Sequence, residues 1–219
     1  LVTEMRRLIP ENGSVLVAGL GNDRITPDAL GPECIEKLLA TRHISAELAK
    51  SIGFENMRSV AGIVPGVLGR TGIETAEIIK GIVHNIKPKA VIVVDALASR
   101  SLSRLGCTVQ LTDSGVSPGS GVGNSRGEIS QRTIGVPVIA VGVPTVVDGA
   151  TLALDIMEKS GIEIDTSEEN GELFKNRIMM VTPKEVDNMI DRAARLVAMG
   201  INTALQPDIP PEDILAIVS

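Results

Sequence analysis

The stretch from Ser14 to Gly31 constrains the fold of this chain more than any other. It begins with the apolar run Val15–Leu20, which is typical of a buried strand. A glycine-containing bend then leads to Thr26 and Pro27, which predict the N-cap and the first residue of a helix. This order of strand, bend and helix places the carboxylate of Asp28 at the carboxyl end of a strand.

A second apolar run, Ala90–Asp95, ends abruptly in an acid. In open parallel α/β sheets the carboxyl ends of the strands line the crevice in which ligands bind, so Asp28 and Asp95 can meet although they lie far apart in the sequence. An acid that follows five apolar residues needs either a buried partner or a function. Asp28 could instead be only a carboxylate at the start of a helix.

Apolar runs and helical patterns alternate along the rest of the chain. Strands that are apolar throughout, alternating with helices, predict an α/β fold, a three-layer, mostly parallel sheet with helices on both faces. The 219 residues suffice for one domain with a substantial core, so we expect residues 1–219 to form a single α/β domain. Further strands are expected at Arg58–Val64, Cys107–Leu111, Val136–Val143 and Ile178–Val181. Helices are expected at Glu74–Ile86, from Asp148 to about Lys159, from a capping box at Thr182–Glu185 to a C-cap at Gly200, and from Pro210. The stretch Gly161–Arg177 is expected to be an inserted surface loop.

The composition excludes several classes of protein. The net charge is −6 and the only adjacent basic pair is Arg6-Arg7, so nucleic acid is not expected to bind directly. No apolar run approaches the ~20 residues that span a bilayer, so we expect no membrane association and a cytoplasmic location. With two cysteines and two histidines, we expect neither a disulfide framework nor a zinc site.

Two glycine-containing loops deserve comparison with ligand-binding loops. Pro65–Gly72 lacks the Lys-Ser/Thr pair that holds phosphate and magnesium in a phosphate loop. Asp113–Asn124 has four glycines, and it could bring backbone amides close to a ligand or be a flexible surface connection. Gly119 and Ser120 in this loop are candidate substrate-binding residues.

Two aspartates that face one crevice suit acid/base hydrolysis of a peptide bond. When two carboxylates approach closely, repulsion keeps one protonated, so one can activate water while the other polarises the carbonyl or protonates the leaving nitrogen. We expect Asp28 to be the base, because a helix dipole would favour its anion, and Asp95 to have the raised pKa. Asn22 could hydrogen-bond a catalytic acid or tolerate a left-handed turn. Asp148 could support the site, although it could also cap a helix, as Asp113 could cap a loop.

Several motifs closely resemble the germination protease family of spore-forming bacteria. They extend over most of the chain, from about Ser14 to about Ala204, and are more specific than any single glycine motif. They are Gly19-Leu-Gly-Asn22, Thr26-Pro-Asp-Ala-Leu-Gly-Pro32, Pro65-Gly-Val-Leu-Gly69, Thr71-Gly-Ile-Glu-Thr75, Val94-Asp-Ala-Leu-Ala98, Pro118-Gly-Ser-Gly-Val-Gly-Asn124, Gly142-Val-Pro-Thr-Val-Val-Asp148 and Val181-Thr-Pro-Lys-Glu-Val-Asp187.

The resemblance implies an endopeptidase that cleaves small acid-soluble spore proteins when a spore germinates, in the forespore or spore core. It also implies a fold like that of hydrogenase maturation endopeptidases, a homotetramer, and a zymogen that removes its own propeptide. The family's two essential aspartates fall by motif on Asp28 and Asp95. The family carries a longer segment before the first strand, so the resemblance implies that this N-terminal segment is missing here.

Other interpretations remain open. The related hydrogenase endopeptidases bind a metal with an additional histidine, and neither His43 nor His84 lies in a motif that supplies one, so we expect metal-independent, aspartic-type hydrolysis with no cofactor. A maturation-type endopeptidase that acts on another precursor, or a non-catalytic sporulation protein that binds peptides, are the alternatives. A dinucleotide-binding protein is a third option, but Gly19-Leu-Gly21 lacks the third glycine of that fingerprint.

Overall fold

The structure, a computed structural model, describes residues 1–51, 53–54, 56–120, 126–161 and 179–218. The expected surface loop at Gly161–Arg177 lies almost entirely outside the described residues, and so does the end of the loop 113–124. Within the described part, no helix is long and apolar enough to cross a membrane.

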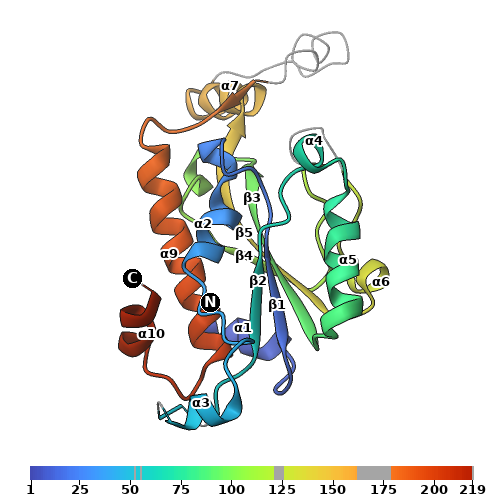
Figure 1. Cartoon of the computed structure of the whole chain (residues 1–219). Helices are drawn as coiled ribbons and strands as arrows, with labels where there is room; N and C mark the ends of the chain where they lie inside the picture. Colours follow the sequence, from blue (N-terminus) through green and yellow to red (C-terminus); the bar gives the residue numbers. More distant parts are fainter. Residues whose placement is uncertain (52, 55, 121–125, 162–178, 219) are drawn as a thin grey trace.

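A mostly parallel sheet forms the middle layer of the molecule, with the strand order β2-β1-β3-β5-β4 (Figure 1). β1, β2, β3 and β5 are parallel, whereas β4 and β6 both pair antiparallel with β5. This arrangement confirms the predicted fold class. The strands are β1 Val15–Gly19, β2 Val60–Ile63, β3 Ala90–Ser99, β4 Gln110–Thr112, β5 Val138–Asp148 and β6 Met180–Val181.

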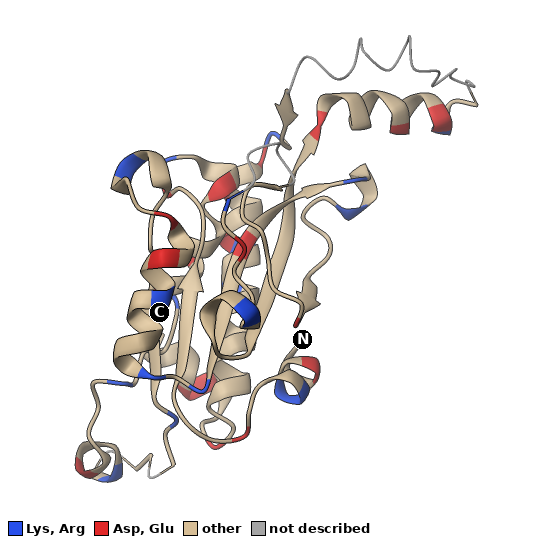
Figure 2. Cartoon of the chain, turned by 90° about the vertical axis from the view of Figure 1, so that its right-hand side faces the viewer, with Lys and Arg blue, Asp and Glu red and all other residues tan. Residues whose placement is uncertain are grey.

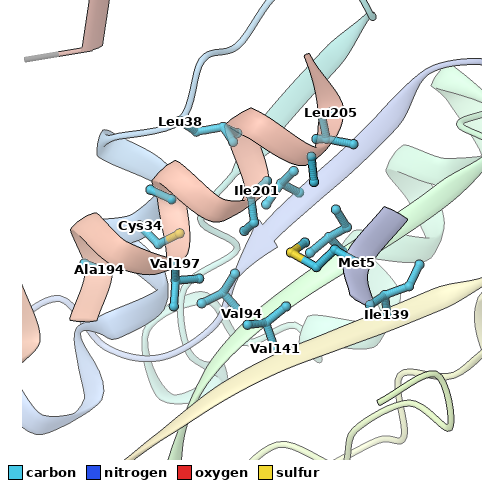
Figure 3. Close-up of a cluster of buried hydrophobic side chains, with 14 of the residues drawn as sticks. Met5, Cys34, Leu38, Val94, Ile139, Val141, Ala194, Val197, Ile201 and Leu205 are labelled. Carbon is cyan, nitrogen blue, oxygen red and sulfur yellow. The ribbon is translucent and has the colours of Figure 1, made fainter. Parts of the chain in front are cut away.

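Helices cover both faces of the sheet, as Figure 1 shows for α2 and α9 on one face and α5 on the other. The α9 face carries the larger core, in which side chains such as Cys34 of α2 and Val197 of α9 pack on Val94 and Val141 of the strands (Figure 3). On the other face, α5 buries Ile79 and Val83 against the sheet. The core is aliphatic, as expected for a chain with two aromatic residues.

The helices of the described residues are α1 Val2–Leu8, η1 Thr26–Asp28 (a 3-10 turn), α2 Leu30–Glu36, α3 Ala46–Ser51, α4 Leu68–Thr71, α5 Thr75–Ile86, η2 Leu102–Arg104 (also 3-10), α6 Gln131–Ile134, α7 Gly149–Lys159, α9 Val186–Leu205 and α10 Pro211–Val218. The expected helices at 74–86, 148–159 and after Pro210 are confirmed. Figure 2 shows α7, which has no fully buried residue, extending away from the body of the sheet.

The predicted ends of α9 are wrong. The helix begins at Val186 and its N-cap, Glu185, makes no side-chain cap hydrogen bond, so the expected capping box at Thr182–Glu185 does not form. Gly200 does not end the helix either, because α9 continues to Leu205. A Cβ on Gly200 would lie 2.5 Å from the side chain of Leu1, so this glycine lets the N-terminus pack against the helix.

Candidate active site

The order of the strands creates a crevice at the carboxyl ends of β1 and β3. The chain passes from β1 to β2 on one side and then crosses to β3 on the other, so the sheet reverses its winding direction between β1 and β3. Ligands in open α/β sheets bind at such a switch point. A cavity of about 720 Å³ lies there, and Asp28 and Asp95 both line it. The structure thus brings together the two predicted carboxylates.

Three glycines let the chain place Asp28 beside the sheet. Gly21 has a φ of 110°, and a Cβ on it would lie 2.0 Å from the carbonyl oxygen of Asp28. Gly19 and Gly31 bring the end of β1 against α2, since a Cβ on Gly31 would lie 2.2 Å from the carbonyl oxygen of Leu20. The absence of three side chains is therefore what allows β1, η1 and α2 to pack closely enough to form the site.

The expected start of the helix at Thr26 is wrong in detail. Thr26 opens the 3-10 turn η1 and makes no capping hydrogen bond, and α2 begins only at Leu30. Asp28 is thus not in the first turn of an α-helix. The expected stabilisation of its ionised form by an α-helix dipole is therefore absent.

Thr145 holds the turn that carries Asp28. It is the extra residue of a β-bulge in β5, because Leu97 pairs with Pro144 and Ala98 with Val146. The Thr145 side chain is buried, and its hydroxyl donates a hydrogen bond of 2.6 Å to the carbonyl oxygen of Pro27. Bulges often re-aim a side chain beside an active site. Thr145 is not among the site residues predicted from the sequence, although a hydroxyl within a strongly apolar strand was a signal.

Burial and a neighbouring charge change the acidity of Asp95. Its side chain is buried, and this desolvation, followed by the charge of Asp28, raises its pKa to about 7, while the backbone N–H of Ala96 lowers it. The expected raised pKa of Asp95 is confirmed. A carboxyl group with this pKa can hold a proton near neutral pH and can therefore act as an acid.

Asp28 is more accessible and is better hydrogen-bonded. Burial raises its pKa, and the backbone N–H of Asn22, which donates a 2.8 Å hydrogen bond to its carboxylate, opposes that rise. The Asn22 side chain instead accepts from the backbone N–H of Arg24, so it stabilises the bend. The left-handed residue of this bend is Gly21, not Asn22. The geometry favours Asp28 over Asp95 as the anion of the pair.

The other predicted site residues fall in different places. Gly119 and Ser120 line the cavity with the two aspartates. Asp148 does not, because its carboxylate accepts a hydrogen bond of 3.1 Å from the backbone N–H of Thr151 as the N-cap of α7. The apolar lining includes Ile25, Leu97 and Val146.

Two further observations concern metals and other cavities. Among the described residues, no group of three or more His, Cys, Asp or Glu side chains is placed to hold a metal ion. A second cavity, of about 830 Å³, opens at the amino ends of the strands, where Arg6, Arg58 and Asp208 line it. It contains neither aspartate of the candidate site.

Comparisons with known proteins identify the family of the chain. A family model described as "Germination protease" matches residues 3–169. Germination proteases of Clostridium acetobutylicum and Clostridium perfringens strain 13 are 48% and 45% identical, over 92% and 94% of this chain and 68% and 70% of theirs. That of Bacillus subtilis is 38% identical, over 94% of this chain and 70% of its own length.

A similar solved structure is the [NiFe] hydrogenase maturation protease HycI from Thermococcus kodakarensis KOD1, with a TM-score of 0.47 and 15% identity over 92% of this chain and 98% of that one. The sequence relatives are much closer, and several exceed 40% identity over most of the chain. Such identity, together with a family match over most of the sequence, shows that the chain belongs to the germination protease family of endopeptidases.

Proposed function

We propose that this endopeptidase uses Asp28 and Asp95 as an aspartic-type pair, with Asp28 ionised and Asp95 protonated. The observation that carries the proposal is the position of both carboxyl groups in one cavity at the switch point of the sheet. Their unequal surroundings separate their roles. Asp95 is the more buried and feels the charge of its neighbour, whereas Asp28 accepts a hydrogen bond from the Asn22 N–H.

The pair can complete the hydrolysis of a peptide bond. Asp28 takes a proton from a water molecule as the water oxygen bonds to the scissile carbonyl carbon, and Asp95 donates a hydrogen bond to the carbonyl oxygen. The tetrahedral intermediate then breaks its C–N bond, and the leaving nitrogen takes up a proton from the pair. The products are a carboxylic acid and an amine, and the pair still holds one proton.

The proposed substrates are the small acid-soluble spore proteins, which are degraded in the spore core at germination. Membership of the germination protease family supports this substrate class, because a germination protease acts in spores. The homotetramer and the zymogen implied by the resemblance stay predictions. The mass of the purified chain in light scattering would test the first.

The test is the cleavage of a purified small acid-soluble spore protein, followed by mass spectrometry of the products. Asp28→Asn and Asp95→Asn are each expected to lower kcat at least ~1,000-fold, because each removes a proton-transfer group from the reaction. Asp113→Asn is the matched control, since Asp113 is an exposed aspartate outside the cavity lining. Full activity of either active-site variant would refute the pair mechanism. Inhibition by EDTA, reversed by added metal, would refute metal independence.

A further inference from the structure

Strand β3 continues beyond its neighbour at the candidate site. β1 pairs with β3 as far as Gly19 opposite Val94, and Leu20 N–H donates a 2.8 Å hydrogen bond to the Val94 carbonyl. The chain then turns away at Gly21. β3 runs on to Ser99, and among the described residues only β5 pairs with this extension.

Some backbone groups of this extension, which follows Val94 in β3, point to the edge along which β1 pairs before it ends. Successive residues of a strand direct their N–H and C=O groups to opposite edges, so Ala96 and Ala98 share the edge of Val94. In the part of the chain that is described, neither alanine has a backbone hydrogen bond outside the pairing of β3 with β5. Both are partly exposed, whereas the preceding part of β3 is fully buried.

This edge is continuous with the candidate active site. Asp95, Ala96, Leu97 and Ala98 all line the cavity, opposite the turn that carries Asp28. The Asp95 carboxyl group also lies close enough to the Ala96 N–H for an interaction. The reactive carboxyl group therefore lies beside the row of backbone groups, at the point where β1 ends.

We propose that the polypeptide substrate binds in an extended conformation as an added strand on the Ala96–Ala98 edge of β3. This inference rests on the proposed function, because the occupant is the substrate segment next to the scissile bond. Backbone pairing aligns that segment along the strand and brings its scissile carbonyl to the two carboxyl groups.

Backbone-modified peptides test the mode of binding. The probe is a fluorescein-labelled peptide of twelve residues, centred on the cleavage site mapped in an intact small acid-soluble spore protein. Its affinity for the Asp95→Asn chain is measured by fluorescence anisotropy, so binding is read without cleavage. N-methylation at one amide after another is expected to weaken binding about tenfold at alternate positions on one side of the scissile bond. Equal losses at every position, no loss, or no binding of the unmodified peptide would overturn the proposal.

A substitution in β3 provides the second arm. Ala98→Pro removes an N–H that the β5 pairing does not use, and it is expected to weaken peptide binding about tenfold. Ala98→Ser, which keeps the N–H, is the matched control, and thermal melting shows whether each variant folds. Should Ala98→Pro not fold, the N-methyl series still decides.

The two proposals can fail separately. If N-methylation weakens binding at alternate amides while the Asp28→Asn variant still cleaves at the full rate, the added strand is supported and the pair mechanism is refuted. Cleavage that depends on both aspartates, with binding insensitive to backbone methylation, would do the reverse.

Discussion

At the scale of single residues, the buried Asp95 carboxyl group destabilises the folded protein when it is ionised. Its pKa is about 7 in the folded chain against an ordinary value of 3.8, so between these values the folded state binds a proton that the unfolded state has released. The contribution of Asp95 to the free energy of unfolding is thus most favourable below about pH 4. It falls as the pH rises towards 7 and is constant above that range.

Replacing this carboxyl group should therefore stabilise the protein. At pH 8, Asp95→Asn is expected to raise the free energy of unfolding on the order of 2 kcal/mol, because it removes a buried anion beside Asp28. Urea denaturation at pH 5 and pH 8 measures the effect, which should shrink at the lower pH. The exposed Asp113→Asn should change stability by less than about 0.5 kcal/mol. A variant of Asp95 less stable than the unmodified chain at pH 8 would indicate a structural role instead.

The shared proton also predicts the pH dependence of cleavage. As the pH rises through about 7 the pair loses its proton, so kcat/KM should fall about tenfold per pH unit on the alkaline side. On the acid side kcat/KM should fall as Asp28 becomes protonated. The pH of this fall should lie above the ordinary pKa of an aspartate, because burial raises the pKa of Asp28. Initial rates between pH 4 and 9 measure the profile. A rate that keeps rising above pH 8 would contradict the proposed protonation state.

Thr145 is expected to be a positioning residue for Asp28. Thr145→Val removes the hydroxyl that bonds to the Pro27 carbonyl, and should lower kcat about tenfold while KM changes little. Thr145→Ser keeps the hydroxyl and should restore most of the rate. If the hydroxyl sets the spacing of the carboxyl groups, the alkaline limb of the pH profile should also move in Thr145→Val. An unchanged profile with only a lower melting temperature would mean that the bond is structural.

At the scale of elements, two helical glycines have opposite expected roles. Gly31 in α2 lies against the backbone of Leu20, whereas no atom lies within 4 Å of a Cβ on Gly81, which is exposed on α5. Gly31→Ala should therefore destabilise the protein by about 2 kcal/mol or more and reduce cleavage, because α2 must move away from β1. Gly81→Ala should stabilise it by about 0.5–1 kcal/mol. Thermal and urea unfolding of the two variants measure the contrast, and equal effects would refute the close-approach argument.

The elements also show how far the sequence could predict the structure. Apolar periodicity was sufficient for the parallel strands and for α5, because burial on one or both faces determines these patterns. The same patterns predicted that Asp28 and Asp95 would lie in one crevice, and both line the same cavity. Local capping signals did not predict the ends of the helices correctly, because tertiary packing determines where a helix ends. Gly200, for example, is a residue type that often ends a helix, but here it makes room for Leu1 within α9.

The rest of the site depends on long-range geometry. The abrupt change from apolar residues to an acid predicted that this strand would end at Asp95. Instead β3 continues to Ser99, because β5 pairs with it as far as that residue. The bulge at Thr145 follows from that pairing and from the approach of η1. No pattern within β5 alone specifies a contact with Pro27, which is far away in the sequence.

At the scale of the whole molecule, the two ends of the sheet perform different tasks. The carboxyl ends carry the candidate site, whereas at the amino ends two buried amide side chains, one in the last turn of α9 and one at its C-cap, tie loops to the core. Asn202 accepts a 2.9 Å hydrogen bond from the Leu39 N–H and donates one of 3.0 Å to the Lys37 carbonyl. Gln206 likewise bonds to the backbone N–H and C=O of Arg58, at 2.8 Å each. Both side chains are buried, so their backbone partners depend on them.

This division predicts that stability and chemistry can be separated by substitution. Asn202→Leu leaves the buried Leu39 N–H and the partly buried Lys37 carbonyl without their partner, so the free energy of unfolding should fall by about 3 kcal/mol. The kcat of the remaining folded protein should stay within about twofold, because α9 contributes no residue to the lining of the cavity. Asn188→Leu, the same change at an exposed position of α9, should have little effect on either quantity. Urea unfolding and cleavage rates corrected for the folded fraction give both measurements, and a large fall in kcat for Asn202→Leu would show that the two ends of the sheet are coupled.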